Sequence, residues 1–175
     1  ILKEIKTTTA LKIKTVLVGY PGSQFLVPGT KYLLDKYPEL DVVFLNHIGT
    51  TQQWSSFVAD YLATIGDEKI ILALDDYLVE FIDIQRLIEA MELQTPVKLC
   101  ECSEEEHIEY PVTTQYTIWD RLELIELLKQ TTSPWDFEIN GSKILGRLTH
   151  LYPCMKYDVH SALSSRWYGV RMNLL

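Results

Sequence analysis

The 175-residue sequence lacks two patterns that would place it in whole classes of protein. No apolar run approaches the roughly 20 residues that a membrane-spanning helix needs, so we expect no transmembrane segment. The three cysteines are an odd number and form no disulfide framework. This cysteine usage fits a reducing compartment, and we therefore expect a cytoplasmic location.

Basic residues are also scarce. The chain carries 16 Lys and Arg against 24 Asp and Glu, which gives a formal net charge of -8. A protein that binds nucleic acid normally presents a basic patch, so we expect no nucleic-acid partner. An anionic small molecule is still possible as a ligand, because a local cluster or a metal ion is enough to bind it.

The composition is otherwise that of one globular domain. Apolar residues make up 47% of the chain and charged residues 23%, and this length can bury a sizeable core. The sequence has no internal repeat, low-complexity segment or linker, so we predict a single domain over residues 1–175. Strand, helix, strand, helix and strand follow one another in the first half, which predicts an α/β fold with a mostly parallel sheet and helices on both faces.

The predicted elements follow from apolar period and turn residues. Strands are expected at 15–20, 41–48, 69–78, 97–102, 113–119 and, in the tail, 166–172. Helices are expected at 31–37, 54–65, 84–91, 120–129 and from 134 onward, with Asp83, Asp120 and Ser133 as their capping residues. The acidic segment 103–109 is predicted to be a solvated loop.

The segment 69–78, KIILALDDYL, contains the most informative pattern. Its apolar run predicts a strand buried on both faces, and two adjacent acids, Asp75 and Asp76, follow the run. Two like charges side by side repel and desolvate badly unless a cation neutralises them. Ligands of open α/β sheets bind at the carboxyl edge of the strands, where this pair is expected to lie. The spacing is equally consistent with two solvated acids that begin a turn.

Two other patterns do not complete a known motif. The glycines at 19 and 22 match neither the dinucleotide fingerprint nor the phosphate-binding loop. Cys100 and Cys102, with His107 nearby, lack the four ligands of a structural zinc site. We therefore expect no zinc site here.

Several stretches together resemble small GT-A-type glycosyltransferases, which are bacterial and viral enzymes that use sugar nucleotides. They are LVGY (17–20), GDEKIILALDDYLV (66–79), YPVTTQYTIWDR (110–121), LLKQTTSPWDFEINGS (127–142) and RWYGV (166–170). The most specific parts are LDDYL and SPWDFEINGS. The resemblance implies a Rossmann-like donor half at about 13–100 and an acceptor half at about 101–175.

The resemblance also implies the donor site. The acid pair would hold a Mn²⁺ or Mg²⁺ ion that bridges the donor diphosphate, with Asp76 on the metal and Asp75 on the sugar. The third position of the family motif, usually an acid, is Tyr77 here. The base and ribose would be lined by the loop residues Val18, Gly19, Tyr20 and Ser23.

The acceptor side is implied by the second half of the chain. Asp136 and Glu138 match the place of the catalytic base of inverting enzymes, and only one can act because they point in different directions on a helix. The capping role open to Asp136 favours Glu138, although both could simply be first-turn acids that the helix dipole stabilises. The acceptor would contact Trp119, Asp120 and Trp135. A core position for Trp119 and a helix cap for Asp120 are the alternatives.

The implied function is a metal-dependent, inverting transfer of a sugar from a UDP-, GDP- or dTDP-sugar to a glycan or other hydroxyl acceptor, as in polysaccharide biosynthesis. One alternative is an inactive sugar-nucleotide-binding or protein-interaction domain of the same fold, since the third acid is missing. Another is a sugar-1-phosphate nucleotidyltransferase. That enzyme would need a Gly-rich loop with Arg and Lys after the first strand, which YPGSQF at 20–25 lacks.

Overall fold

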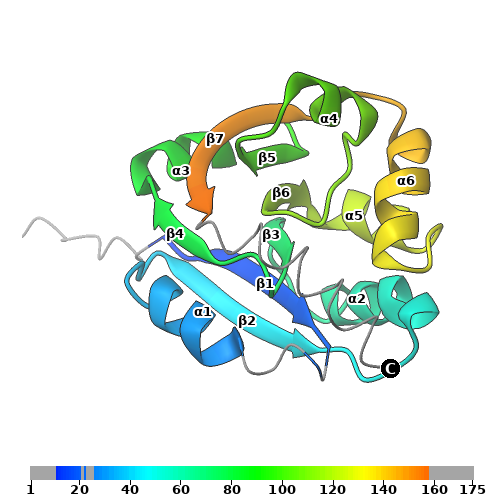
Figure 1. Cartoon of the computed structure of the whole chain (residues 1–175), viewed down its shortest axis with the longest axis horizontal. Coiled ribbons are helices and arrows are strands. Elements are labelled where there is room, and N and C mark those ends of the chain that lie inside the picture. Colours follow the sequence, from blue (N-terminus) through cyan, green and yellow to red (C-terminus); the bar gives the residue numbers. More distant parts are fainter. Residues whose placement is uncertain (1–10, 21, 23–25, 158–175) are drawn as a thin grey trace, which may run out of the picture.

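A computed structural model describes residues 11–20, 22 and 26–157 (Figure 1). Its seven strands form one sheet in the order β2-β1-β3-β6-β5-β7-β4. The strands are β1 (Ile13–Gly19), β2 (Leu40–Asn46), β3 (Lys69–Leu74), β4 (Val79–Ile82), β5 (Val97–Cys100), β6 (Thr117–Asp120) and β7 (His150–Tyr157). The helices are α1 (Val27–Leu34), α2 (Trp54–Leu62), α3 (Ile84–Met91), α4 (Glu104–Glu109), α5 (Arg121–Leu128) and α6 (Pro134–Leu145), with a short 3₁₀ helix η2 (Thr51–Gln53) before α2.

The sheet is mixed, and the predicted α/β class is confirmed. Strand β1 pairs in parallel with β2 and β3, and β5 pairs in parallel with β7. Strand β6 is antiparallel to both of its neighbours, β3 and β5, and β4 is antiparallel to β7. Two strands therefore run against the other five, so the ends of β6 and β3 lie at opposite edges of the sheet.

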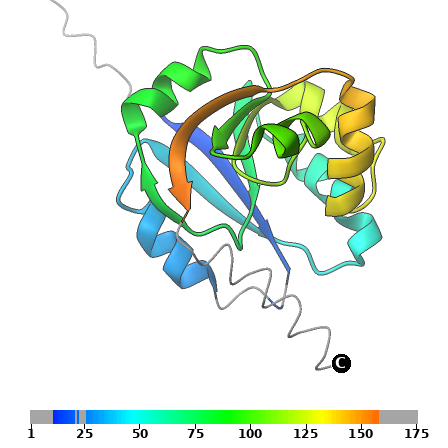
Figure 2. The same cartoon turned by 45° about the horizontal axis from the view of Figure 1, so that its top comes forward.

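Helices cover both faces of the sheet, as predicted. Successive residues of a strand point to opposite faces, and the two hydrophobic clusters follow this alternation: Leu17 and Ile71 belong to one, Val16 and Leu72 to the other. The first cluster includes side chains of α1 and α3, and the second includes side chains of α2, α5 and α6. Strand β7 arches from its start beside β5 to its end beside β4 (Figures 1 and 2).

The local signals at helix starts are confirmed. The Asp83 carboxylate accepts a hydrogen bond from Arg86 N at 3.1 Å and begins α3. The Asp120 carboxylate accepts from Glu123 N at 2.9 Å and begins α5. Ser133 Oγ accepts from the backbone N–H of the third helical residue, at 3.1 Å, and begins α6 with a proline in its first turn. These caps need only residues three apart in sequence, which is why the sequence predicts them.

Other predicted elements are wrong. The segment 103–109 is not a loop, because Ser103 caps α4 and three glutamates occupy its first turn, where the helix dipole stabilises acids. The strand predicted over 69–78 ends at Leu74, and residues 75–78 form a turn into β4. The sequence analysis missed β4 and also β7, whose Pro153 weakens the strand signal. The strand predicted at 166–172 lies outside the described residues.

Within the residues that the structure describes, no helix is both long and apolar enough to cross a membrane. The three cysteines all lie in the described ranges, and none of them forms a disulfide.

Candidate active site

The acid pair lies where three parallel strands end. Asp75 N donates a hydrogen bond to Val18 O of β1 at 3.1 Å, and His47 N, just after β2, donates to Gly19 O at 2.8 Å. These two contacts join the carboxyl ends of β1, β2 and β3 at one edge of the sheet. Asp75 is buried and Asp76 is half-buried in the turn that follows β3. The acids therefore stand at the edge where α/β sheets bind ligands.

The acid pair supplies a donor set that suits a hard divalent cation. Among the described residues, no group of three or more His, Cys, Asp or Glu side chains is arranged to hold a metal ion without further ligands. Mg²⁺ is commonly bound by one or two carboxylates together with phosphate oxygens and water. Asp75 and Asp76 fit that pattern, with Asp75 largely out of water and Asp76 more accessible.

Glu138 reaches the same edge from α6. Its Oε1 accepts hydrogen bonds from Thr114 N and Thr114 Oγ1, both at 2.8 Å, and from Thr113 Oγ1 at 3.3 Å. Thr114 O in turn accepts from Leu74 N, the last residue of β3, at 3.0 Å. Thr114 thus links the end of the acid-bearing strand to Glu138. All three bonds end on Oε1, so the carboxylate is held in one orientation while Oε2 makes no hydrogen bond to any residue in the described ranges.

The phenol of Tyr77 is influenced by the charges of both Asp76 and Glu138. Burial raises the pKa of its phenol, and the negative charges of Glu138 and Asp76 raise it further, while a hydrogen bond with Thr114 lowers it. The phenol therefore stays neutral at physiological pH and keeps its O–H proton. The third position of the acid motif thus carries a neutral hydroxyl close to both Asp76 and Glu138.

Asp136 has a different environment from Glu138. Its Oδ2 accepts from Thr132 N at 2.8 Å and Thr132 Oγ1 at 3.2 Å, and Asn140 Nδ2 donates to Oδ1. The hydrogen bond from Asn140, followed by those from Thr132, holds the pKa of this carboxyl below its usual range. With both oxygens occupied and its proton affinity lowered, Asp136 is built to fix the start of α6 rather than to accept a proton.

A buried lysine, Lys98, binds the segment that leads to Thr113 and Thr114, and the sequence analysis did not select it. Lys98 on β5 donates from Nζ to Tyr110 O at 2.6 Å. Burial lowers the pKa of the Lys98 ammonium, whereas the charges of Cys102, Glu106 and Glu138 raise it. A charged residue inside the otherwise apolar run VKLC was the signal that could have found it.

Of the two tryptophans expected to contact the acceptor, one is buried and one is exposed. Trp119 is fully buried, and its ring centroid lies 5.9 Å from that of Phe137 in the core. Because no sugar can reach a buried ring, Trp119 is a core residue, and its predicted contact with the acceptor is wrong. Trp135 is 58% exposed in the first turn of α6, so its ring is accessible to a ligand.

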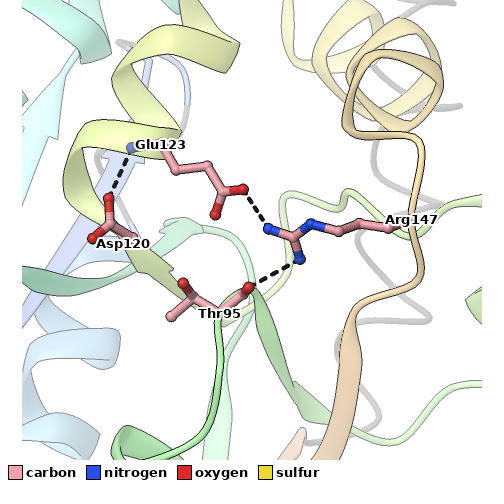
Figure 3. Close-up of polar contacts among 4 residues, drawn as sticks. All are labelled: Thr95, Asp120, Glu123 and Arg147. Carbon is pink, nitrogen blue, oxygen red and sulfur yellow. Dashed lines mark hydrogen bonds and ion pairs between the residues drawn. The ribbon is translucent and has the colours of Figure 1, made fainter.

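Asp120 lies at the wrong edge of the sheet for an acceptor site beside Asp75. It is paired with Lys69, the first residue of β3, because β6 runs antiparallel to β3. Figure 3 shows Asp120 capping Glu123, whose side chain pairs with Arg147, which also donates to Thr95 O at 3.0 Å. Asp120 is therefore a structural cap, and its predicted role in the acceptor site is wrong.

Only some of the loop residues expected to line the donor lie at the sheet edge that bears the acid pair. The side chain of Val18 is buried in the core, so only its backbone is available at the edge. Gly19 ends β1, and Tyr20 follows it, half-buried, at the same edge. Ser23 lies outside the described residues. The predicted base and ribose contacts of this loop therefore stay predictions.

No protein-family model matches the sequence, and no curated protein matches it significantly. Among solved structures, the chain is similar to HddC from Yersinia pseudotuberculosis, with 11% identity and a TM-score of 0.46. The similarity covers 84% of this chain and 73% of that chain. An overlap at this level establishes neither a family nor a function.

Proposed function

We propose that this chain is a metal-dependent glycosyltransferase that moves a sugar from a nucleoside-diphosphate sugar to a hydroxyl acceptor. One observation carries the proposal: Thr114 joins the end of the strand that bears Asp75 and Asp76 to the Glu138 carboxylate on α6. The acid pair and an oriented carboxylate thereby share one sheet edge. Transfer of a sugar to a hydroxyl group needs a site for the diphosphate and a base for the acceptor at one place. The arrangement therefore agrees with the function that the sequence resemblance implies.

The acid pair would hold Mn²⁺ or Mg²⁺, and the bound ion would supply charge neutralisation for the leaving diphosphate. Asp76, the more accessible of the two acids, would bind the metal, and Asp75 would orient the sugar hydroxyls. Glu138 Oε2 would accept the proton of the acceptor hydroxyl as that oxygen attacks the anomeric carbon. The bond between the anomeric carbon and the diphosphate oxygen breaks, and its electron pair leaves with the diphosphate. The neutral phenol of Tyr77 would be a hydrogen-bond donor near Asp76 and Glu138.

Donor binding is tested by a thermal-shift panel of UDP, GDP and dTDP, each with and without Mn²⁺. A ligand present at 100 times its Kd adds about 2.7 kcal/mol to stability, which for a domain of this size raises Tm by about 5–10 °C. We expect one nucleotide to raise Tm in a Mn²⁺-dependent manner. Asp76→Asn should abolish this shift, whereas Asp60→Asn, which changes an exposed acid on α2, should retain it. A shift that survives Asp76→Asn contradicts the metal assignment.

The catalytic step is tested with the matching nucleotide sugar and a panel of glycoside acceptors. Glu138→Gln should keep the nucleotide shift and lower transfer at least about 100-fold, which is the contribution of a positioned general base. Glu105→Gln, at an exposed position of α4, is the matched control. Nucleotide binding without any transfer by the wild-type chain would favour the binding-domain alternative instead.

A further inference from the structure

Lys98 of β5 points to the face of the sheet that α6 covers. Strand β5 pairs with β6, and β6 pairs with β3, so that Lys98, Thr117 and Leu72 lie side by side across three strands. Residues paired across neighbouring antiparallel strands point to the same face. Leu72 belongs to the hydrophobic cluster that includes side chains of α2, α5 and α6. Lys98, which is only 4% exposed, is therefore buried on the side from which α6 brings Glu138.

The Lys98 ammonium is bound to the start of the segment 110–114. Its Nζ donates a hydrogen bond to Tyr110 O at 2.6 Å. The end of the same segment carries the two hydrogen bonds from Thr114 to Glu138 Oε1, both at 2.8 Å. A single short segment thus connects the buried lysine to the carboxylate that would act as the base.

Helix α6 holds the middle of this segment. Val112 N donates to Ser142 Oγ at 3.0 Å, and Ser142 lies four residues after Glu138 in α6. A Cβ atom added at Gly141 would lie 3.4 Å from Val112 Cγ1, so the helix and the segment are in close contact. The segment is therefore fixed to α6 at its middle and end, and Lys98 fixes its start to β5.

The charges around Lys98 include Glu138. Burial lowers the pKa of the Lys98 ammonium, and the negative charges of Cys102, Glu106 and Glu138 act against that shift. Burial raises the pKa of the Cys102 thiol, which is therefore uncharged at neutral pH. Burial and the charge of Lys98 both lower the pKa of His107 on α4, so this ring is neutral as well. At neutral pH the anions that attract the ammonium are thus Glu106 and Glu138.

The packing of β5 does not require a charge at position 98. Val97 and Leu99, on either side of Lys98, are apolar and fully buried. Removing an ammonium from water is unfavourable, and an apolar side chain of similar volume often gives an equally stable or more stable protein. The contacts with Tyr110 and with the carboxylates are what distinguishes Lys98 from such an apolar residue.

We propose that Lys98 is a positioning residue for the Glu138 base. Its ammonium holds the start of the segment 110–114 and places a positive charge on the Glu138 side of the sheet, so that Oε1 stays bound to Thr114. Lys98 acts through this segment and does not touch the substrate. The inference rests on the proposed function, because it names the residue that keeps the base of that reaction in place.

The positioning role is tested first without nucleotide, by amide hydrogen exchange of the full chain followed by NMR at pH 7. The Thr114 amide donates to Glu138 and reports whether this link is closed. We expect Lys98→Met to speed exchange of the Thr114 amide at least about tenfold, the loss expected for a hydrogen bond from a charged donor. The amides of Val16 and Leu72, in the central strands, should keep their wild-type rates.

The effect on the reaction is tested with the sugar nucleotide and the acceptor that give transfer. Lys98→Met should lower kcat about 10- to 100-fold, the cost of misplacing a catalytic group, and leave the KM for the donor unchanged. Lys98→Arg keeps both the charge and a hydrogen-bond donor, so it should recover most of kcat. Lys98→Gln keeps a donor without the charge and should recover much less. Lys129→Met, which removes an exposed lysine at the end of α5, should change neither kcat nor Thr114 exchange.

Several results would overturn the positioning role. The first is a wild-type exchange rate of the Thr114 amide in Lys98→Met, and the second is a wild-type kcat in that variant. A third is Lys98→Gln as active as Lys98→Arg, because the charge would then contribute nothing. Equally fast exchange at Thr114, Val16 and Leu72 would mean that Lys98 supports the whole fold rather than the base.

The two proposals fail separately. A wild-type chain without a nucleotide-dependent thermal shift and without transfer would overturn the proposed function, and the Thr114 amide would still decide whether Lys98 holds the segment 110–114. A Mn²⁺-dependent nucleotide shift with transfer, together with unchanged Thr114 exchange in Lys98→Met, would retain the transferase and overturn the positioning role.

Discussion

Replacing Glu138 should separate its structural role from its chemical role. Glu138 Oε1 receives three hydrogen bonds from Thr113 and Thr114, both of which are buried. Glu138→Ala leaves the Thr114 N–H without its acceptor, and an unsatisfied buried donor costs about 1–3 kcal/mol. With the loss of the two hydroxyl contacts, we expect the free energy of unfolding to fall by about 3 kcal/mol.

Glu138→Gln should behave differently, because an amide oxygen can accept the same three hydrogen bonds. We expect a loss of no more than about 1 kcal/mol, since the bonds lose the added strength of a charged acceptor. For a domain of this size, 1 kcal/mol corresponds to about 2–4 °C in Tm. The alanine variant should therefore melt about 6–12 °C lower than the wild type, and the glutamine variant within about 4 °C of it.

The assay is urea unfolding followed by circular dichroism at pH 7, with thermal melts as a second measurement and Glu105→Gln as the control. Transfer activity should be lost in both Glu138 variants, although only the alanine variant is strongly destabilised. A glutamine variant as unstable as the alanine variant would refute the reasoning, because the charge rather than the acceptor geometry would then hold the loop. Wild-type stability in both variants would show that the Thr114 link contributes nothing.

Two further predictions concern positions away from the acid pair. Gly49→Ala should lower the free energy of unfolding by about 1–3 kcal/mol, because the added Cβ would lie 2.6 Å from Gln53 Oε1 and 2.8 Å from His47 Cε1. Gly29→Ala, in open space within α1, should instead raise stability by up to about 1 kcal/mol in the same urea assay; the same sign for both would contradict the steric argument. Burial lowers the pKa of Lys98, so the unfolded chain holds this proton more firmly, and wild-type stability relative to Lys98→Met should rise as the pH approaches about 10.4. A stability difference between the two proteins that does not change with pH would contradict the lowered pKa of Lys98.

The local parts of the fold could be predicted from the sequence. Helix caps at Asp83, Asp120 and Ser133 depend on residues three positions apart, and they form as predicted. The acid pair after a buried strand is likewise a local pattern, because an apolar run and a turn are contiguous in the chain. Helix α4 was missed, since its stability comes from a serine cap and the helix dipole rather than from an apolar face.

The direction of β6 could not be predicted, because strand direction depends on which distant segments form hydrogen bonds. The sequence gives no local sign that β6 runs antiparallel to β3. That reversal moves Asp120 to the edge opposite Asp75. Trp119 is buried for a different reason, because β6 lies inside the sheet and the ring packs against Phe137 of α6.

The sequence by itself determined the acid pair, the carboxylates of the SPWDFE segment and the α/β class, because each is written in contiguous residues. The tertiary structure alone decided which of those carboxylates is linked to the end of the strand that bears the pair. Glu138 is hydrogen-bonded to Thr114, which is 24 residues away in sequence, whereas Asp136 is bonded to Thr132, just before α6, and to Asn140 on the same helix. The hydrogen bonds that distinguish Glu138 from Asp136 join segments far apart in the chain, so no pattern within a short window of sequence predicts them.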